Sequence, residues 1–137
     1  MKRDGLLYTG KPYVFQGALA AGTAANYEME LTAPGKIKEL HIKFAAGENG
    51  TLHIRPMVIQ NGEIPIDLVA YGPGLNQFVS GDDEQFNFKC FMPIENGAKI
   101  RIVADNQGAY ASFVDVAVIV DYADIVREYS VIEGARI

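Results

Sequence analysis

The sequence of 137 residues contains no tryptophan, one cysteine and two histidines. A single cysteine excludes a disulfide framework and any zinc site built from several cysteines. There are 12 basic residues against 17 acidic ones, and no basic run is longer than Lys2-Arg3. Because nucleic-acid binding requires a basic surface that neutralises phosphates, we expect no nucleic-acid partner.

Long hydrophobic runs are also missing. The longest apolar-rich run, residues 113–120, contains Asp115 and is far shorter than the roughly 20 residues of a membrane-spanning helix. After Lys2-Arg3, Gly5 and Gly10 interrupt what would be the apolar core of a signal peptide. We therefore expect no membrane partner, no cleavable signal and synthesis in a cytoplasm, with which the lone Cys90 agrees.

Residues that favour β-structure are abundant. Val, Ile, Phe, Tyr and Thr make 42 of the 137 residues, and 14 glycines and 6 prolines are spread along the chain as turn signals. Hydrophobic content of 49% with 21% charged residues excludes intrinsic disorder. We predict one all-β domain over residues 1–122, an antiparallel β-sandwich of jelly-roll type with about nine strands.

Three Asn-Gly pairs, at 49–50, 61–62 and 96–97, are typical of tight turns between antiparallel strands. The first two separate the extended runs 36–44, 51–60 and 63–71, which we interpret as a three-stranded meander. A one-residue change of phase after Ile37 indicates a bulge, and Pro56 belongs at an edge or a bulge. We also expect short strands at 13–15, 27–31 and 75–80, with a loop or a lightly packed edge over 17–26.

The longest predicted strand lies near the end of the domain. Val114, Val116, Val118, Val120 and Tyr122 occupy one face, and Phe113, Ala117 and Ile119 occupy the other. Apolar residues on both faces predict either a central strand or one covered on its outer side by another subunit.

The two histidines are the main candidates for a metal centre. His41 and His53 both alternate with apolar neighbours and so point away from the core. If their strands pair in the meander, they approach each other, and a small metalloenzyme is conceivable. We favour two solvent-facing histidines, because no third ligand has suitable spacing.

Other candidate groups are weaker. Cys90 alternates with Phe88 as a core residue, and Ser80, Ser112 and Ser130 lack a histidine or a nucleophile turn. Asp82, Asp83 and Glu84 form an acidic cluster that we interpret as a charged loop tip, with calcium as the alternative. Exposed tyrosines such as Tyr71 or Tyr110 are candidates for stacking on a sugar. We predict no catalytic residue, metal or cofactor.

Both ends are unusually apolar. Residues 123–137, which we treat as a C-terminal extension, include Ile125, Val126, Tyr129, Val131, Ile132 and Ile137, and Leu6-Leu7-Tyr8 lies near the start. Termini fray unless they are held. Two interpretations of these apolar ends are open: they pack on their own domain, or they dock on a neighbouring subunit.

The stretch 86–122, from Phe86 to Tyr122, contains a strand, Pro93, the Asn96-Gly97 turn, a Lys-Ile-Arg-Ile strand and a long Val-alternating strand. It resembles the C-terminal half of jelly-roll auxiliary, head-decoration or fibre-type structural proteins of tailed bacteriophages. The resemblance implies a virion component, commonly a homotrimer, that binds the major capsid protein or another virion protein through whole surfaces.

Our leading hypothesis is therefore a non-enzymatic structural protein of a virus particle, located in the virion, that self-associates as a homo-oligomer, with a trimer favoured. The alternative is a carbohydrate-binding module or a fibre domain that contacts host glycans.

Overall fold

The computed structural model describes residues 10–60, 62–69 and 78–122. The extension 123–137, Leu6-Leu7-Tyr8, Tyr71, Ser130, Asn61 and residues 75–77 of the strand predicted at 75–80 lie outside the described residues. Within the described ranges, no helix is long and apolar enough to cross a membrane.

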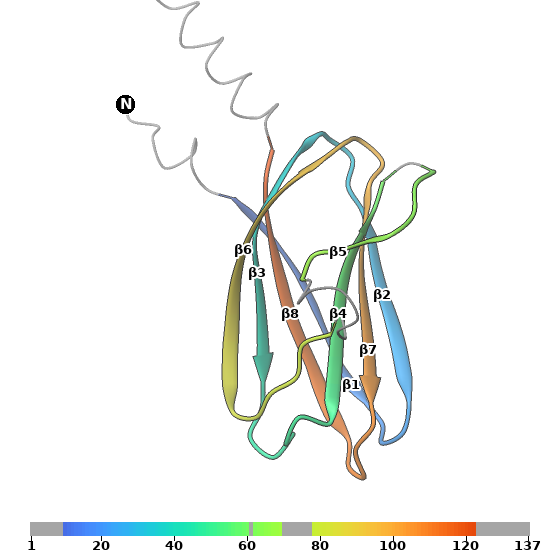
Figure 1. The fold of residues 1–137 in the computed structure, drawn as a ribbon, viewed down its shortest axis with the longest axis vertical. Helices are drawn as coiled ribbons and strands as arrows, with labels where there is room; N and C mark the ends of the chain where they lie inside the picture. Colours follow the sequence, from blue (N-terminus) through green and yellow to red (C-terminus); the bar gives the residue numbers. More distant parts are fainter. Residues whose placement is uncertain (1–9, 61, 70–77, 123–137) are drawn as a thin grey trace, which may run out of the picture.

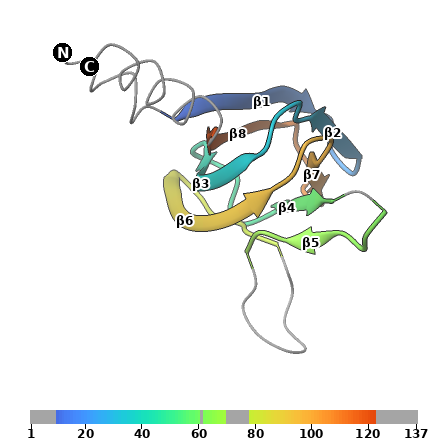
Figure 2. The same ribbon diagram turned by 90° about the horizontal axis from the view of Figure 1, so that it is seen from above.

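The described residues form two four-stranded antiparallel sheets packed face to face, as Figures 1 and 2 show. Sheet A has the order β1-β8-β3-β6 and sheet B the order β2-β7-β4-β5. The strands are β1 (Lys11–Leu19), β2 (Ala24–Glu30), β3 (Gly35–Phe44), β4 (Leu52–Ile59), β5 (Ile66–Asp67), β6 (Glu84–Ile94), β7 (Lys99–Asn106) and β8 (Ser112–Asp121).

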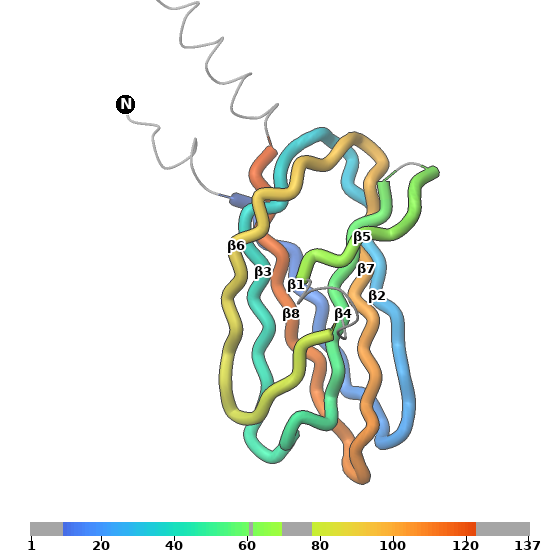
Figure 3. The backbone as a smooth tube through the Cα atoms, viewed as in Figure 1, coloured from blue at the N-terminus to red at the C-terminus, as the bar shows by residue number. Residues whose placement is uncertain are grey.

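This strand order confirms the predicted β-sandwich, with eight strands where about nine were expected. Apart from β4 and β5, consecutive strands belong to different sheets, so the chain passes repeatedly from one sheet to the other (Figure 3). Two sheets of four strands in which β1 lies beside β8 and β2 beside β7 have jelly-roll topology.

The predicted meander is wrong in its first pairing. Asn49 and Gly50 do adopt the positive φ angles, 51° and 74°, that a primed turn requires. Their turn nevertheless leads from β3 in sheet A to β4 in sheet B, and only β4 and β5 pair as expected, over two residues. The turn chemistry is local, whereas the sheet that the next strand joins depends on distant partners.

The core lies between the sheets and contains the inward side chains that alternation predicts. Ile37, Leu40, Ile100, Ile102, Val114 and Val118 are fully buried. The phase change after Ile37 is confirmed, because the pairing of β3 with both neighbours shifts between Ile37 and Glu39. The central position of β8, between β1 and β3, is confirmed as well.

The loop predicted at 17–26 is shorter in the structure. Gly17 and Ala18 continue β1 opposite Val114 and Phe113, so only four residues separate β1 from β2. Gly17 packs closely against β2, because a Cβ there would lie 2.8 Å from the Tyr27 hydroxyl oxygen and the Tyr27 side chain would have to shift. Small residues in this stretch therefore serve close packing between strands.

A tyrosine pair connects the two strands that begin and end the described domain. The Tyr13 and Tyr122 hydroxyls are hydrogen-bonded, and their rings meet edge to face at 82° with centroids 6.5 Å apart. Tyr122 is 8% exposed, and this burial, with the bond to Tyr13, raises the pKa of its phenol above the ordinary value of about 10.

We expect this pair to make the fold sensitive to alkali. Above pH ~10 the unfolded chain loses the Tyr122 proton while the folded chain keeps it, so stability declines by up to ~1.4 kcal/mol per pH unit. Denaturant melts between pH 8 and 11.5 measure the slope. Tyr122→Phe is expected to flatten it, and Tyr110→Phe, on an exposed residue, is the control. Equal slopes for wild type and Tyr122→Phe would contradict this assignment.

Candidate functional site: a pocket between two loops

Two loops lie side by side at one end of the sandwich, residues 45–51 between β3 and β4 and residues 107–111 between β7 and β8 (Figures 1 and 3). The Gln107 amide donates to the Thr51 carbonyl oxygen at 2.9 Å and joins one loop to the other. The topology thus brings together segments that are about 60 residues apart in the sequence.

Asn106 holds the β7–β8 loop. Its side chain is fully buried, and Nδ2 donates to the carbonyl oxygens of Leu19, Ala20 and Tyr110 at 3.1, 3.3 and 2.9 Å. Its Oδ1 accepts from the Gly108 amide at 2.9 Å. One buried amide therefore fixes the turn that carries Tyr110 and connects it to the end of β1.

Asp82 holds the β3–β4 loop. Its Oδ1 accepts from the amides of Gly47 and Asn49 at 2.8 and 3.2 Å. Thr51 donates its amide and its hydroxyl to the Glu48 carbonyl oxygen at 2.9 and 2.6 Å. The acidic cluster at 82–84 thus supplies a loop-organising carboxylate, and the described residues contain no group of three or more His, Cys, Asp or Glu side chains placed to hold a metal.

Glu48 occupies an unusual position for a loop glutamate. It is 7% exposed, and Oε2 accepts from the Phe113 amide at 3.3 Å. The other carboxylate oxygen, Oε1, is buried and has no hydrogen-bond partner among the described residues. An unsatisfied buried acceptor is costly, and the cost is higher when it carries charge.

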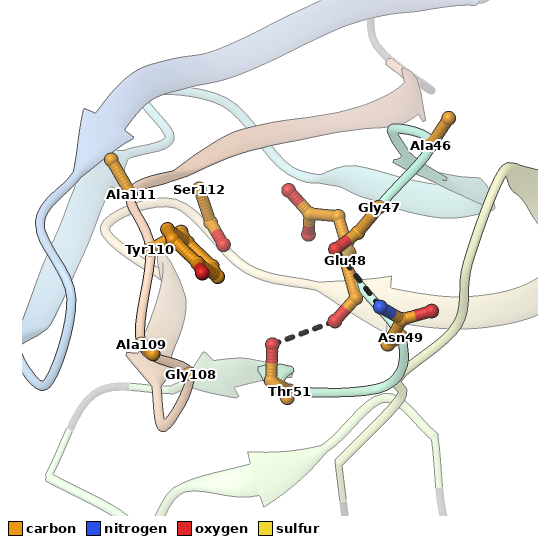
Figure 4. A pocket seen from close by; sticks show the side chains of 10 residues that line it. All are labelled: Ala46, Gly47, Glu48, Asn49, Thr51, Gly108, Ala109, Tyr110, Ala111 and Ser112. Atoms are coloured by element: carbon orange, nitrogen blue, oxygen red, sulfur yellow. Dashed lines mark hydrogen bonds between the residues drawn. The ribbon is translucent and has the colours of Figure 1, made fainter.

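The carboxylate of Glu48 lies beside a pocket of about 230 Å³. Figure 4 shows Glu48 on one side of this space, with Tyr110 of the β7–β8 loop and Ser112, the first residue of β8, on the other. Tyr110 is 83% exposed, while Ser112 is buried. The remaining lining is mostly small: Ala46, Gly47, Asn49, Thr51, Gly108, Ala109 and Ala111.

The two histidines do not form a pair. His41 is on β3 in sheet A and His53 on β4 in sheet B, so the approach expected from a meander is wrong. His41 Nε2 lies 2.9 Å from Glu39 Oε1, and His53 stacks on Phe78 with ring centroids 3.9 Å apart. Both are half-buried on the outer faces of their sheets, as predicted from their buried neighbours.

Cys90 packs against the core but is half-buried. Desolvation, with the nearby charge of Glu39, raises the pKa of the Cys90 thiol, which therefore stays protonated and unreactive at neutral pH.

A second surface feature is the outer face of β1 and β8. Three apolar cross-strand pairs line it: Pro12 with Ile119, Val14 with Ala117, and Ala18 with Phe113. Val14 is 53% exposed and Phe113 46% exposed. The one polar pair is Gln16 with Asp115, whose side chains are hydrogen-bonded at 3.0 Å. We call these eight residues the β1–β8 outer face.

No protein-family model and no curated protein sequence matches this chain. Among solved structures, the chain is similar to the Yersinia pseudotuberculosis-derived mitogen, with a TM-score of 0.52, 10% identity and coverage of 81% of this chain and 86% of that one. This likeness shows a shared β-sandwich fold.

Two more distant structures have TM-scores below 0.5. A carbohydrate-binding module, CBM32-1, from a Clostridium perfringens family 31 glycoside hydrolase has a TM-score of 0.45 and 14% identity over 74% of this chain and 75% of that one. The infectious bursal disease virus VP2 subviral particle has a TM-score of 0.41 and 12% identity over 87% of this chain and 35% of that one. Neither bears on function.

Part of the pocket between the two loops was predictable from the sequence. Tyr110 was predicted to be exposed, and it is. Glu48 was missed, because a glutamate before Asn-Gly is normally solvated and nothing local signals that the amide of Phe113, 65 residues later, bonds to its carboxylate.

Proposed function

We propose that this chain is a non-enzymatic structural protein of a virus particle, a phage auxiliary capsid or head-decoration protein that acts through self-association and capsid binding. The observation that carries the proposal is the β1–β8 outer face, where apolar side chains are paired and exposed on the side of the sheet that faces away from the core. The outer face of an antiparallel sheet in an isolated domain is normally polar.

A second copy of the chain is the occupant that we propose for this face. Burying the exposed valine and phenylalanine side chains in an interface would stabilise the complex by roughly 25 cal/mol per Å² of apolar area removed from water. A hollow of about 170 Å³, lined by Lys43, Ala45, Phe113 and Asp115, adjoins the face and offers room for an inserted side chain. Symmetric association of identical subunits is the usual way in which such a surface is buried.

The charged side chains around the β1–β8 outer face are of both signs. This favours a second copy of the chain as the occupant over a partner whose surface carries a single sign of charge. On β8, Asp121 lies opposite Lys36 of β3, and on the far side of β3, Glu39 lies opposite Lys89 of β6. Because acidic and basic side chains are interspersed there, two copies are able to place opposite charges against each other around the face.

Size-exclusion chromatography with light scattering tests the self-association. We expect a trimer, with three times the 14.9 kDa mass of one chain, at micromolar concentration. A strict monomer would contradict the proposal. The viral assignment is tested separately by the neighbouring genes: capsid and portal genes would support it, and a purely metabolic neighbourhood would not.

Sugar binding is the second candidate, and Tyr110 favours it. Its ring is 83% exposed beside a pocket that also contains a buried carboxylate, the combination of flat apolar surface and hydrogen-bond acceptor that sugar rings require. A glycan array under calcium-replete conditions tests it. Binding to no sugar would remove this candidate and leave the self-association proposal untouched.

A further inference from the structure

We propose that the pocket between the β3–β4 and β7–β8 loops binds a single sugar ring, with Glu48 Oε1 accepting hydroxyl hydrogen bonds and Tyr110 stacking on the ring. This inference rests on the second candidate function above, and it assigns that function to one site and to particular atoms.

The first step is the unpartnered oxygen. Glu48 Oε2 already accepts from the Phe113 amide, but Oε1 is buried with no partner among the described residues. A buried carboxylate oxygen in this state gains more from a donor than an exposed one, since it has already lost its water. A ligand donor reaches Oε1 only if the Glu48 side chain turns toward the pocket, so the ligand should present hydrogen-bond donors on the Glu48 side of the pocket.

The second step is the shape of the opposite wall. Tyr110 presents an exposed aromatic ring, and Ser112 adds a hydroxyl from the start of β8 (Figure 4). A sugar ring has hydroxyl donors around its rim and a C–H face that packs on an aromatic ring, so it meets both walls at once. A ligand that only donates hydrogen bonds, such as an ammonium group, would bond to Glu48. It would offer no acceptor to the hydroxyl hydrogen of Ser112.

The third step is size and rigidity. Glycine and alanine form half of the lining, and the pocket has a volume of about 230 Å³, below the roughly 300 Å³ at which pockets for drug-sized ligands begin. One ring fits, and further sugar residues would extend into solvent. Because Asn106 and Asp82 already hold the two loops, binding does not have to order them.

A divalent cation is the main competing occupant. Calcium takes six or more oxygen ligands and usually several carboxylates. Glu48 is the one carboxylate in the pocket lining, which argues for a neutral polyhydroxyl ligand instead.

The test is titration calorimetry of the full chain with the simplest glycoside that binds in the array. We expect Glu48→Gln to weaken binding about tenfold or more, because a carboxylate acceptor becomes a weaker amide. Tyr110→Ala is expected to weaken it about fivefold. Glu63→Gln, an exposed glutamate in the β4–β5 loop, is the matched control and should bind like wild type.

Each outcome separates the possibilities. Unchanged binding in both pocket variants would overturn this site but leave sugar binding in place, whereas no binding by wild type would remove both. Calcium alone binding to wild type and not to Glu48→Gln would show a cation site and overturn the proposal. If Glu48→Gln fails to fold, Tyr110→Ala, on a side chain that is mostly exposed, decides the matter.

Discussion

Replacing Asn106 with alanine is expected to lower the free energy of unfolding by about 3 kcal/mol. The Asn106 side chain is fully buried and makes four hydrogen bonds to main-chain groups of two segments, residues 19–20 and 108–110. Without it, the carbonyl oxygens of Leu19 and Tyr110 and the Gly108 amide lose their partner, and the β7–β8 turn loses its internal support. Denaturant-induced unfolding followed by circular dichroism measures the change.

Asn87→Ala is the matched control. Asn87 lies on the exposed side of β6, and among the described residues its side chain bonds to that of Gln85 alone. We expect a change within ~0.5 kcal/mol for this variant. If Asn106→Ala is no more destabilising than Asn87→Ala, the loop is held by something other than the buried amide.

Replacing Val14 with glutamate is expected to convert the oligomer to a monomer. Val14 lies in the middle of the β1–β8 outer face, opposite Ala117, and is 53% exposed in the isolated chain. A carboxylate at this position would be buried without a partner in any complex formed through the face, at a cost of several kcal/mol. Light scattering at several concentrations gives the mass, and circular dichroism shows that the fold is retained.

Ile64→Glu provides the comparison for this variant. Ile64 is 84% exposed in the segment between β4 and β5, so the substitution also exchanges an exposed apolar side chain for a charge. It should leave the oligomeric state unchanged. Loss of the oligomer in both variants would place the interface elsewhere, and retention in Val14→Glu would rule out the β1–β8 outer face.

The sequence predicted the strands well and their partners poorly. Alternation located β3, β7 and β8 and their buried faces, since a strand with one face in a core shows its period of two directly. The turn at Asn49-Gly50 was also recognised. The sheet that the strand after this turn joins was not predicted. The residues of a turn fix its φ angles, but they leave open whether the next strand pairs with the previous one or crosses to the other sheet.

The candidate site shows the same limit. Tyr110 was identifiable, because it lies in a short polar and small-residue segment between two strands. The burial of Glu48 and the buried role of Asn106 depend on contacts with residues 65 and 87 positions away, Phe113 and Leu19. The separation of His41 from His53 depends on sheet membership, which no local pattern specifies.

The pairing of β1 with β8 has a consequence for how the chain folds. Lys11 lies opposite Val120, so the first described strand to be synthesised finds its only partner in sheet A in the last one. Folds dominated by such distant pairings fold slowly, in milliseconds to seconds, because loop closure precedes the contacts that stabilise it. Sheet A is therefore completed only after β8 has left the ribosome, and until then β1 has no paired strand in sheet A.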